Sequence, residues 1–279
     1  MIARIVVVNY NGAAFVAEAL ESALAQSAAC EVVMVDNAST DGSPETIEGG
    51  FPRVRVLRAG SNRGFGAAAT LGALAEPRDY DYVAFLNPDA TAQPGWIETL
   101  CAWMDRERID IGSSVVAGAA APFFAGGRWQ PFLSSAYEVR AFADERTDWI
   151  SGCAMVVRRE AFDRLGGFDP SYFLYYEDVD LSLRASALGM RLGVYSEALV
   201  SHPVEGRITD RLGRREKHRI GFASKGRLAG KHVPAFALPS ALLFQCLVSP
   251  AYNGVPLRDY ATIAGAFLEG FRSARRHTS

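Results

Sequence analysis

The chain contains little cysteine, and its few thiols form no pattern. Four cysteines stand far apart among 279 residues, with no C-x-x-C pair and no histidine at metal-ligand spacing beside them: Cys30, Cys101, Cys153 and Cys246. This spacing indicates neither a zinc site nor a disulfide framework. Reduced thiols predict a cytoplasmic protein.

Two phosphate-binding loops are also missing. The turn after the first predicted strand, "NYNGAAF", lacks the G-x-G-x-x-G of dinucleotide-binding folds, and G-x-x-x-x-G-K-[ST] occurs nowhere in the chain. Since each loop uses its glycines to bring the backbone close to phosphate, their absence disfavours dehydrogenases and P-loop kinases.

Long hydrophobic runs are scarce. The N-terminus, "MIARIVVVNYNG", lacks the basic, apolar and small-residue regions of a signal peptide and is predicted to be a strand. The most apolar tail segment, residues 235–248, is interrupted by Pro239 and followed by Pro250. We therefore expect it to be too short to span a bilayer.

The formal net charge of -2 hides an uneven distribution. From Val200 onward the chain has thirteen Lys or Arg against five Asp or Glu, so the tail is basic and the body acidic. This pattern indicates either an interaction surface at the C-terminal end or a solvated basic face. We expect no nucleic-acid partner.

Apolar runs rich in Val and Ile alternate with helical patterns in the first part of the chain. The predicted strands are 5–8, 32–35, 54–57 and 83–86, and the predicted helices are 13–26, 65–74 and 96–106. This rhythm predicts an α/β fold with a mostly parallel sheet flanked by helices. Residues 117–148 are irregular and form either a long substrate loop or a short antiparallel excursion.

Sheets of this kind bind ligands beyond the carboxyl ends of their strands. In "VVMVDNASTDGS", Asp36 stands at such an end and can accept hydrogen bonds from a ribose or a base, although the same residue types are typical of an ordinary turn. In "SNRGFGAAATLG", Arg63 and the first helical amides either face an anion or belong to a simple helix start.

The stretch "YDYVAFLNPDATAQPGW" places Asp89 directly after a buried strand. A rigid Asn-Pro-Asp turn holds this carboxylate in place, and hard divalent cations prefer carboxylate oxygen. The alternative is a plain Asp in a strand-to-helix turn. His202 follows another strand, 193–200, and is predicted either to bind a metal or to be a packed histidine.

The densest signal is "YFLYYEDVDLSLRASALGM", where Glu177, Asp178 and Asp180 follow four aromatic residues. Crowded carboxylates beside apolar rings raise one another's pKa, which is how a general base is tuned. An i,i+4 pair of Asp180 with Arg184 would be structural.

These segments together, with "NYNG", "NPD" and "GGFD", resemble the family 2 glycosyltransferases over residues 2–203. The resemblance implies a GT-A type nucleotide-diphospho-sugar-binding fold and a hexosyltransferase of EC 2.4 type. It implies a catalytic domain at 1–205, with a nucleotide-binding half at 1–110 and an acceptor-side half at 111–205. A basic, helical extension would follow at 206–279.

The resemblance also assigns roles to single residues. It implies a general base at Asp178 with Glu177 beside it, and a metal site of Asp89 and His202 for Mg²⁺ or Mn²⁺. "NPD" is similar to the family's D-x-D motif with Asn87 in place of an Asp, which leaves strict metal dependence open. The nucleotide would be bound by Asn9, Tyr10, Asn11, Asp36, Asn62, Arg63 and Asn87, and the donor sugar or acceptor by Trp149, Gly152 and Tyr176.

The branch most similar in its motifs is that of bacterial rhamnosyltransferases, which use dTDP-L-rhamnose; galactosyl, galactofuranosyl and other UDP-sugar transferases compete. The Q-x-x-R-W signature of processive synthases is absent after Asp178. The resemblance thus implies one inverting transfer to a glycan or lipid-linked acceptor in polysaccharide or cell-wall biosynthesis.

Two other classes stay open as alternatives. A sugar-phosphate nucleotidyltransferase would use a Gly-rich basic loop after the first strand, which "NYNGAAF" does not supply. A non-catalytic carbohydrate-binding protein would need aromatic side chains but not Glu177 and Asp178 beside a metal motif.

The last predicted helix, in "DYATIAGAFLEGFRSARR", has apolar residues at helical spacing and arginines at its end. It is predicted to pack on the body, to lie on an anionic membrane at the inner face of the plasma membrane, or to form a homodimer contact. We prefer packing on the body.

Overall fold

A computed structural model describes residues 1–119, 122–143, 146–202 and 213–276. Its first part alternates strands and helices as the apolar runs predict. The elements are β1 (Ile2–Asn9), α1 (Val16–Leu24), β2 (Ala29–Asp36), α2 (Ser43–Gly50), β3 (Val54–Arg58), α3 (Phe65–Ala73), β4 (Tyr82–Leu86), β5 (Thr91–Ala92) and α4 (Trp96–Glu107).

The next part contains more strands than the sequence pattern shows. The elements are β6 (Ile111–Ala117), β7 (Pro122–Phe124), β8 (Gly127–Gln130), η1 (Pro131–Leu133), β9 (Ser135–Glu138), β10 (Ala154–Arg158), α5 (Arg159–Leu165), α6 (Glu177–Ala187) and β11 (Leu192–Ser201). Because β8 and β9 pair antiparallel, the irregular segment is an antiparallel excursion and not a structureless loop.

Within the described residues, nine strands form one sheet in the order β3-β2-β1-β4-β10-β6-β11-β5, with β7 on β6. The pairs among β3, β2, β1 and β4 are parallel, as is β6 with β11, whereas β10 runs antiparallel to both neighbours. The predicted mostly parallel sheet is confirmed. Since Asn9 pairs with Asp36 and Val7 with Leu86, the carboxyl ends of β2, β1 and β4 meet at one edge.

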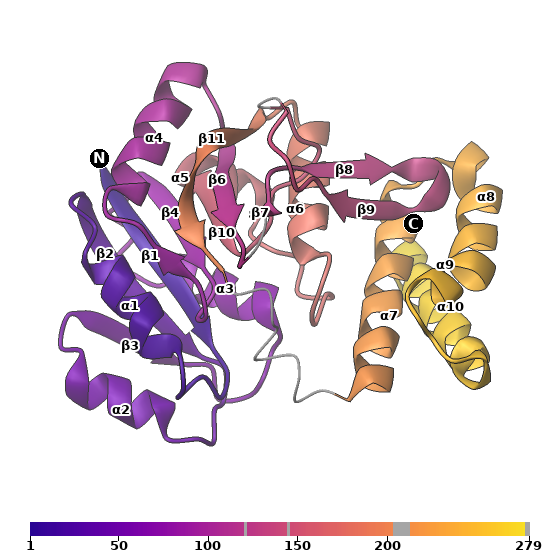
Figure 1. Ribbon diagram of the computed structural model, residues 1–279, viewed down its shortest axis with the longest axis horizontal. Coiled ribbons are helices and arrows are strands. Elements are labelled where there is room, and N and C mark those ends of the chain that lie inside the picture. Colours follow the sequence, from indigo (N-terminus) through magenta and orange to yellow (C-terminus); the bar gives the residue numbers. More distant parts are fainter. Residues whose placement is uncertain (120–121, 144–145, 203–212, 277–279) are drawn as a thin grey trace.

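Burial explains why these runs become strands. All five residues of β4 are buried, and so are seven of the eight in β1. A strand that is covered on both faces needs apolar side chains throughout. The helices that flank the sheet provide this cover (Figure 1). The polar residues that end these strands therefore mark the edge where the buried sheet reaches solvent.

The C-terminal part is helical and has its own cluster of buried side chains, among them Phe222, Ile263 and Phe267. Its elements are α7 (Arg214–His232), η3 (Ala235–Ala237), α8 (Leu238–Leu243), η4 (Phe244–Val248), α9 (Ser249–Tyr252), η5 (Leu257–Asp259) and α10 (Tyr260–Arg276). They stand beside the sheet-containing body, and the β8–β9 hairpin reaches across to α8 (Figure 1). The predicted boundary at 205/206 lies outside the described residues and stays a prediction.

Small residues set the close approach of α7 and α10. A side chain at Gly226 would place its Cβ 1.9 Å from the carbonyl oxygen of Phe267, and one at Gly270 would lie 2.0 Å from that of Ala223. The apolar face of α10 is buried in this contact, with Ile263 and Phe267 fully covered. The helix therefore packs mainly on α7 of the C-terminal part, and not on the sheet-containing body as the preferred prediction had it.

The prediction for the apolar tail segment is wrong. Pro239 and Pro250 lie in the first turns of α8 and α9, where proline is tolerated, so the helical run continues from Ala235 to Tyr252. By length and composition these 18 residues are sufficient to cross a membrane, and 28% of them are buried.

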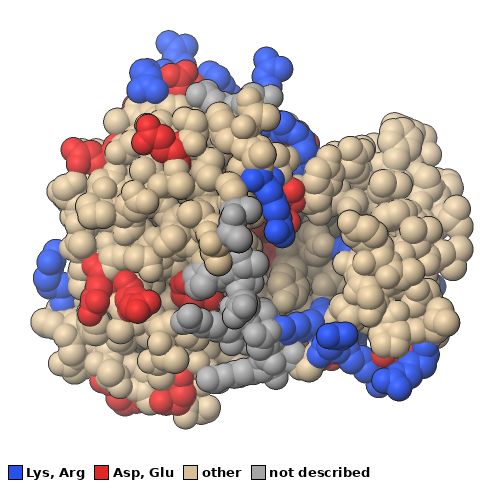
Figure 2. Space-filling model, viewed as in Figure 1, with Lys and Arg blue, Asp and Glu red and all other residues tan. Residues whose placement is uncertain are grey.

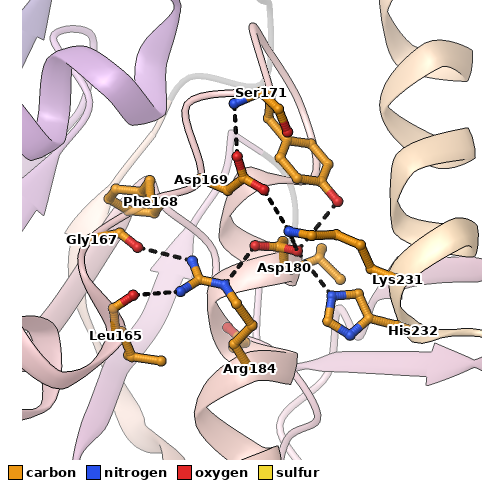
Figure 3. A network of polar contacts seen from close by, with 12 residues as sticks. Leu165, Gly167, Phe168, Asp169, Ser171, Asp180, Arg184, Lys231 and His232 are labelled. Carbon is orange, nitrogen blue, oxygen red and sulfur yellow. Dashed lines mark hydrogen bonds and ion pairs between the residues drawn. The ribbon is translucent and has the colours of Figure 1, made fainter. Parts of the chain in front are cut away.

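A buried carboxylate connects this helical part to the sheet-containing body. Asp180 on α6 is fully buried and accepts hydrogen bonds from Arg184 Nε at 2.8 Å, Lys231 Nζ at 2.7 Å and His232 Nε2 at 2.9 Å (Figure 3). Arg184 also donates to the carbonyl oxygens of Leu165 and Gly167. The predicted Asp180–Arg184 pair is confirmed. The other two donors to Asp180, Lys231 and His232, belong to α7.

The same contacts decide the charge state of Asp180. Burial alone would raise the pKa of this carboxyl, but the hydrogen bond to His232 and the charges of Lys231 and Arg184 bring it well below the usual range. A depressed pKa contributes stability above the unfolded pKa of about 4, and that contribution is lost as the pH falls below it.

We predict that Asp180→Asn lowers the free energy of unfolding by about 3–5 kcal/mol at neutral pH, because it leaves buried cations without a counter-charge. The measurement is denaturant unfolding followed by circular dichroism. Glu216→Gln, which removes an exposed i,i+3 partner of Arg219 on α7, is the control and should cost less than about 1 kcal/mol. Equal, small losses in both variants would contradict the role given to Asp180.

Candidate active site

A cavity of about 640 Å³ opens at the carboxyl edge of the sheet. Its size suits a nucleotide sugar, since ligand pockets commonly measure about 300–1,000 Å³. The residues around it come mainly from strand ends and the turns that follow them: Val8, Tyr10, Asn11, Asn37, Asn62, Asn87, Pro88, Asp89, Phe123, Ser151, Gly152, Cys153, Phe173, Leu174, Tyr175, Glu177, Asp178 and His202.

Amide side chains organise the wall formed by β1, β2 and the start of α3. Asn37 Nδ2 donates to Asn62 Oδ1 at 2.9 Å and to the Gly64 carbonyl, while Asn37 Oδ1 accepts the backbone N–H of Arg63. Asn11 Oδ1 accepts the N–H of Thr40. These contacts fix the loops after β1, β2 and β3 relative to one another and leave Tyr10 exposed at the rim.

Three residues with a predicted nucleotide-binding role do not line this cavity. Asn9 is fully buried, and its amide donates to Ser43 Oγ at 2.8 Å; Asp36, 3% exposed, accepts the N–H of Ser39. The side chain of Arg63 is exposed. Asn9 and Asp36 thus hold the loops by hydrogen bonds from positions outside the cavity lining. The nucleotide-binding role of all three residues stays a prediction.

Asp89 and His202 meet inside the cavity although 113 positions separate them in the sequence. His202 Nε2 lies 3.1 Å from Asp89 Oδ1 and 3.3 Å from Asn87 Nδ2. The backbone N–H of His202 donates to the Ala117 carbonyl, and Phe123 stacks on the imidazole at 4.7 Å between ring centroids. Both side chains are buried, at 5% and 9% exposed.

This pair fits a divalent cation. Two adjacent ligands in an octahedral shell with bonds of about 2.1 Å lie about 3 Å apart, which is close to the observed separation of Nε2 and Oδ1. A carboxylate, an imidazole and the Asn87 amide suit Mn²⁺ or Mg²⁺. Among the described residues, no group of three or more His, Cys, Asp or Glu side chains is placed to hold a metal. The remaining ligands would come from the diphosphate and water.

The carboxylates at the start of α6, Glu177 and Asp178, line the same cavity. Tyr175 and Tyr176, just before the helix, both have a left-handed backbone, with φ of 68° and 69°. Such a conformation costs a non-glycine residue about 1–3 kcal/mol and is concentrated at functional sites. It turns the chain so that Glu177 and Asp178 begin the helix at the cavity.

Glu177 and Asp178 differ in what contacts them. Gly152 and Val179 donate backbone N–H groups to the two oxygens of Asp178 at 2.9 and 2.8 Å, and this side chain is half-buried. Glu177 is 6% exposed, and its Oε2 has no hydrogen-bond partner within the described structure. Withdrawal from water raises the pKa of both carboxyls, and the charge of Asp178 raises that of Glu177 further.

Of the two carboxyls, Glu177 is therefore the one on which a proton is favoured, since burial and the charge of Asp178 raise its pKa and its Oε2 has no hydrogen-bond partner among the described residues. Asp178 remains ionised, accessible and supported by two N–H donors, which is the state required of a base. The predicted rise in pKa is confirmed in direction for Glu177 and Asp178 and is wrong for Asp180, whose pKa is lowered by its hydrogen bond to His232 and by the charges of Lys231 and Arg184.

The structure brings the metal pair and the base together. Asp89, His202 and Asp178 line the same cavity, and the Cys153 thiol lies near enough to both aspartates that burial and then their charges raise its pKa well above the ordinary value. Asp36 does not line this cavity.

The residues expected to contact sugar or acceptor divide between two cavities. Gly152 lines the first, and its N–H holds Asp178. Trp149 and Tyr176 line a second cavity of about 470 Å³, which also reaches Glu177 and Asp178. Trp149 is 5% exposed and packs on Phe124. Their contact with a substrate stays a prediction.

Asn37 and Phe123 are part of the site but were not among the predicted site residues. Asn37 follows Asp36 at a strand end, so its position was a usable signal. Phe123 lies in the irregular segment, where no periodicity indicates that β7 pairs with β6 and brings the ring onto His202.

Comparison with known proteins identifies the family of the chain. The profile of the family Glycosyl transferase family 2 matches residues 4–166. N-acetylglucosaminyl-diphospho-decaprenol L-rhamnosyltransferase of Mycobacterium tuberculosis is 34% identical over 222 residues, which cover 68% of this chain and 72% of that protein.

Solved structures share the fold at low identity. GalNAc-T7 with UDP, GalNAc and Mn²⁺ has a TM-score of 0.68 at 17% identity and covers 98% of this chain and 54% of its own. S. aureus TarS 1-349 in complex with UDP-GlcNAc has a TM-score of 0.60 at 16% identity and covers 100% and 91%. The predicted GT-A type fold is confirmed, and the chain belongs to the family 2 glycosyltransferases.

Proposed function

We propose that this glycosyltransferase moves L-rhamnose from dTDP-L-rhamnose to a hydroxyl of a lipid-linked, diphosphate-bearing sugar, with inversion and one addition per acceptor. The observation that carries the proposal is that the Asp89–His202 pair and Asp178 line one and the same cavity. A departing diphosphate and an incoming hydroxyl need groups of these two kinds on opposite sides of the anomeric carbon.

The choice of sugar and acceptor is supported by the mycobacterial relative, whose name gives an L-rhamnosyl donor group and a diphospho-decaprenol acceptor. Galactosyl, galactofuranosyl and other UDP-sugar transfers remain the competing choices. The expected location at the inner face of the plasma membrane stays a prediction.

Asp178 is proposed to accept the proton of the acceptor hydroxyl as this oxygen attacks the anomeric carbon. Gly152 and Val179 hold the carboxylate in place, and each oxygen keeps a free lone pair. One base suffices, because a diphosphate leaves without a general acid, whereas glycoside hydrolases need two carboxylates.

Asp89 and His202, with Asn87 beside them, are the residues proposed to hold the metal. A bound Mg²⁺ or Mn²⁺ would neutralise the charge that develops on the leaving diphosphate. Phe123 covers one face of the imidazole and the Ala117 carbonyl fixes its backbone, so the His202 ring is oriented before the donor binds.

The two other classes fit less well. A nucleotidyltransferase would release pyrophosphate, and the family profile does not describe that reaction. A carbohydrate-binding protein without activity gives no reason for a half-buried Asp178 with two N–H donors facing a buried Asp–His pair.

We predict that Asp178→Asn lowers kcat by at least about a hundredfold, since an amide cannot accept the proton. The assay mixes nucleotide sugars, Mn²⁺ and a GlcNAc-diphosphate-lipid acceptor and measures released nucleoside diphosphate. Binding of dTDP, followed by calorimetry, should stay within about threefold of wild type.

Glu107→Gln on the exposed end of α4 is the control for this substitution. Full activity of Asp178→Asn would remove the base assignment. Release of pyrophosphate by the wild-type enzyme from a nucleoside triphosphate and a sugar 1-phosphate, supplied in a parallel reaction, would instead support nucleotidyl transfer and contradict the proposed reaction.

The pH dependence tests which carboxylate is the base. Because the pKa of Asp178 is raised above its ordinary 3.8, kcat/KM should rise with pH along a limb clearly above that value. In Glu177→Gln the limb should persist, since a neutral amide replaces a carboxyl that is already protonated. Disappearance of the limb in Glu177→Gln would show that Glu177 is the group that titrates.

Removal of one metal ligand should weaken metal binding and leave the stability of the fold unchanged. We predict that Asp89→Asn raises the Kd of Mn²⁺, measured by electron paramagnetic resonance with dTDP present, by at least about tenfold. Chelation of the metal should stop transfer by the wild-type enzyme. Unchanged Mn²⁺ binding in Asp89→Asn would place the metal elsewhere.

A further inference from the structure

The second cavity, of about 470 Å³, lies between the start of α6 and helix α7. It reaches Asp178 as the first cavity does, whereas Asp89 and His202 line only the first cavity. Figure 2 shows a hollow between the sheet-containing body and the C-terminal helices, with lysine and arginine side chains along its rim. In the proposed reaction the donor and the metal occupy the first cavity, so the second cavity is available to the acceptor.

One face of α7 forms the basic wall of this cavity. Arg214, Lys217, His218, Gly221 and Lys225 line it, and their spacing places them on one side of the helix. Their exposure falls along the helix, from the exposed Arg214 through the half-buried Lys217 and His218 to Lys225, which is 9% exposed. Gly221 has no side chain to fill the space between them.

Lys225 has no carboxylate partner among the residues that the structure describes. Its Nζ donates to Ser249 Oγ at 3.4 Å and lies 4.6 Å from the centre of the Phe222 ring, and within the described residues it forms no ion pair. Lys231, two turns further along the same helix, shows the usual arrangement, with ion pairs to Asp169 and Asp180.

An unpaired, buried ammonium is unfavourable, since its hydration is lost without a compensating charge. Burial lowers the pKa of Lys225 to about 8, so the group still carries its charge at neutral pH. Its charge faces the cavity, and a ligand with negative charge would supply the partner that the protein does not.

The other wall carries acidic groups, and they limit where an anion can lie. Glu138, Glu177 and Asp178 line the cavity opposite α7. An anion is therefore favoured along the α7 wall, and a neutral hydroxyl beside Asp178. A sugar joined to a phosphate group has this division of charge within one molecule.

We propose that the second cavity binds the phosphate or diphosphate linkage of the acceptor, with Lys225, Lys217 and Arg214 as its cationic ligands. This rests on the proposed function, because it assumes that an acceptor sugar reaches Asp178. The linkage pairs with the ammonium of Lys225 while the sugar hydroxyl faces the base, so the enzyme selects acceptors by charge as well as by sugar.

The surroundings of Lys225 suit an acceptor with a lipid chain. Ser249, its hydrogen-bond partner, begins α9, and Asn253 after this helix lines the cavity. The neighbouring apolar side chains Leu247, Val248 and Tyr252 are 60%, 51% and 88% exposed. A chain leaving the phosphate in this direction would meet apolar surface.

The test compares two acceptors that carry the same sugar. GlcNAc-diphosphate-farnesol contains the anionic linkage, and octyl β-GlcNAc lacks it. We expect wild-type kcat/KM to favour the diphosphate by about tenfold to a hundredfold, the range of a charge-assisted contact, and Lys225→Met to reduce this preference to about threefold or less. Lys217→Met, at a half-buried position, should reduce it in the same direction.

Stability provides an independent readout. Met has similar length and no charge, so Lys225→Met should raise the melting temperature while it weakens the preference for the diphosphate. Arg106→Met removes one exposed cation from α4 and should leave both quantities unchanged. An undiminished preference in both Lys225→Met and Lys217→Met would overturn the proposal, as would a higher KM for the donor with the acceptor preference intact.

A binding experiment separates this proposal from the proposed function. Asp178→Asn protein saturated with dTDP and Mn²⁺ is titrated with GlcNAc-diphosphate-farnesol, with and without Lys225→Met. A loss of affinity of about tenfold or more supports the anion site even if no transfer is observed. Equal affinity in the two proteins contradicts it even if rhamnosyl transfer is confirmed.

Discussion

The buried carboxylate of Asp180 connects the parts of this enzyme. It accepts hydrogen bonds from side chains of two helices: Arg184 of its own helix, α6, and Lys231 and His232 of α7. Because α6 begins with the proposed base and α7 carries the basic wall, this contact fixes the distance across the second cavity. The buried and fully paired carboxylate of Asp180 thus positions the proposed base, Asp178, and the basic wall of α7 relative to each other.

Three carboxylates within four positions of α6 have different states because their surroundings differ. Asp180 accepts a hydrogen bond from His232 and has the charges of Lys231 and Arg184 beside it, so its pKa lies well below the usual range. Asp178 has two N–H donors and access to the cavities, whereas Glu177 has no donor for Oε2 and holds the proton. Sequence proximity alone gives none of these assignments; packing against Gly152 and α7 decides them.

Much of the site was predictable because strand ends of a parallel sheet meet at one edge. The apolar runs predicted β1 to β4, and the polar residues after them led to Asn87 and Asp89. Pairings across long separations were not predictable from periodicity: β7 on β6, which places Phe123 over His202, and α7 beside α6, which exposes Lys225 to the second cavity. Asn9 and Asp36 show that a polar residue at a strand end also serves as a buried support.

The account depends on a metal-held diphosphate and a base facing each other across one cavity. The most direct measurement is the anomalous difference map of crystals soaked with Mn²⁺ and dTDP-L-rhamnose. We expect one Mn²⁺ peak bound by Asp89 and His202 Nε2, with the anomeric carbon between the diphosphate and Asp178. A Mn²⁺ peak away from this pair, or a donor sugar turned away from Asp178, would contradict the account.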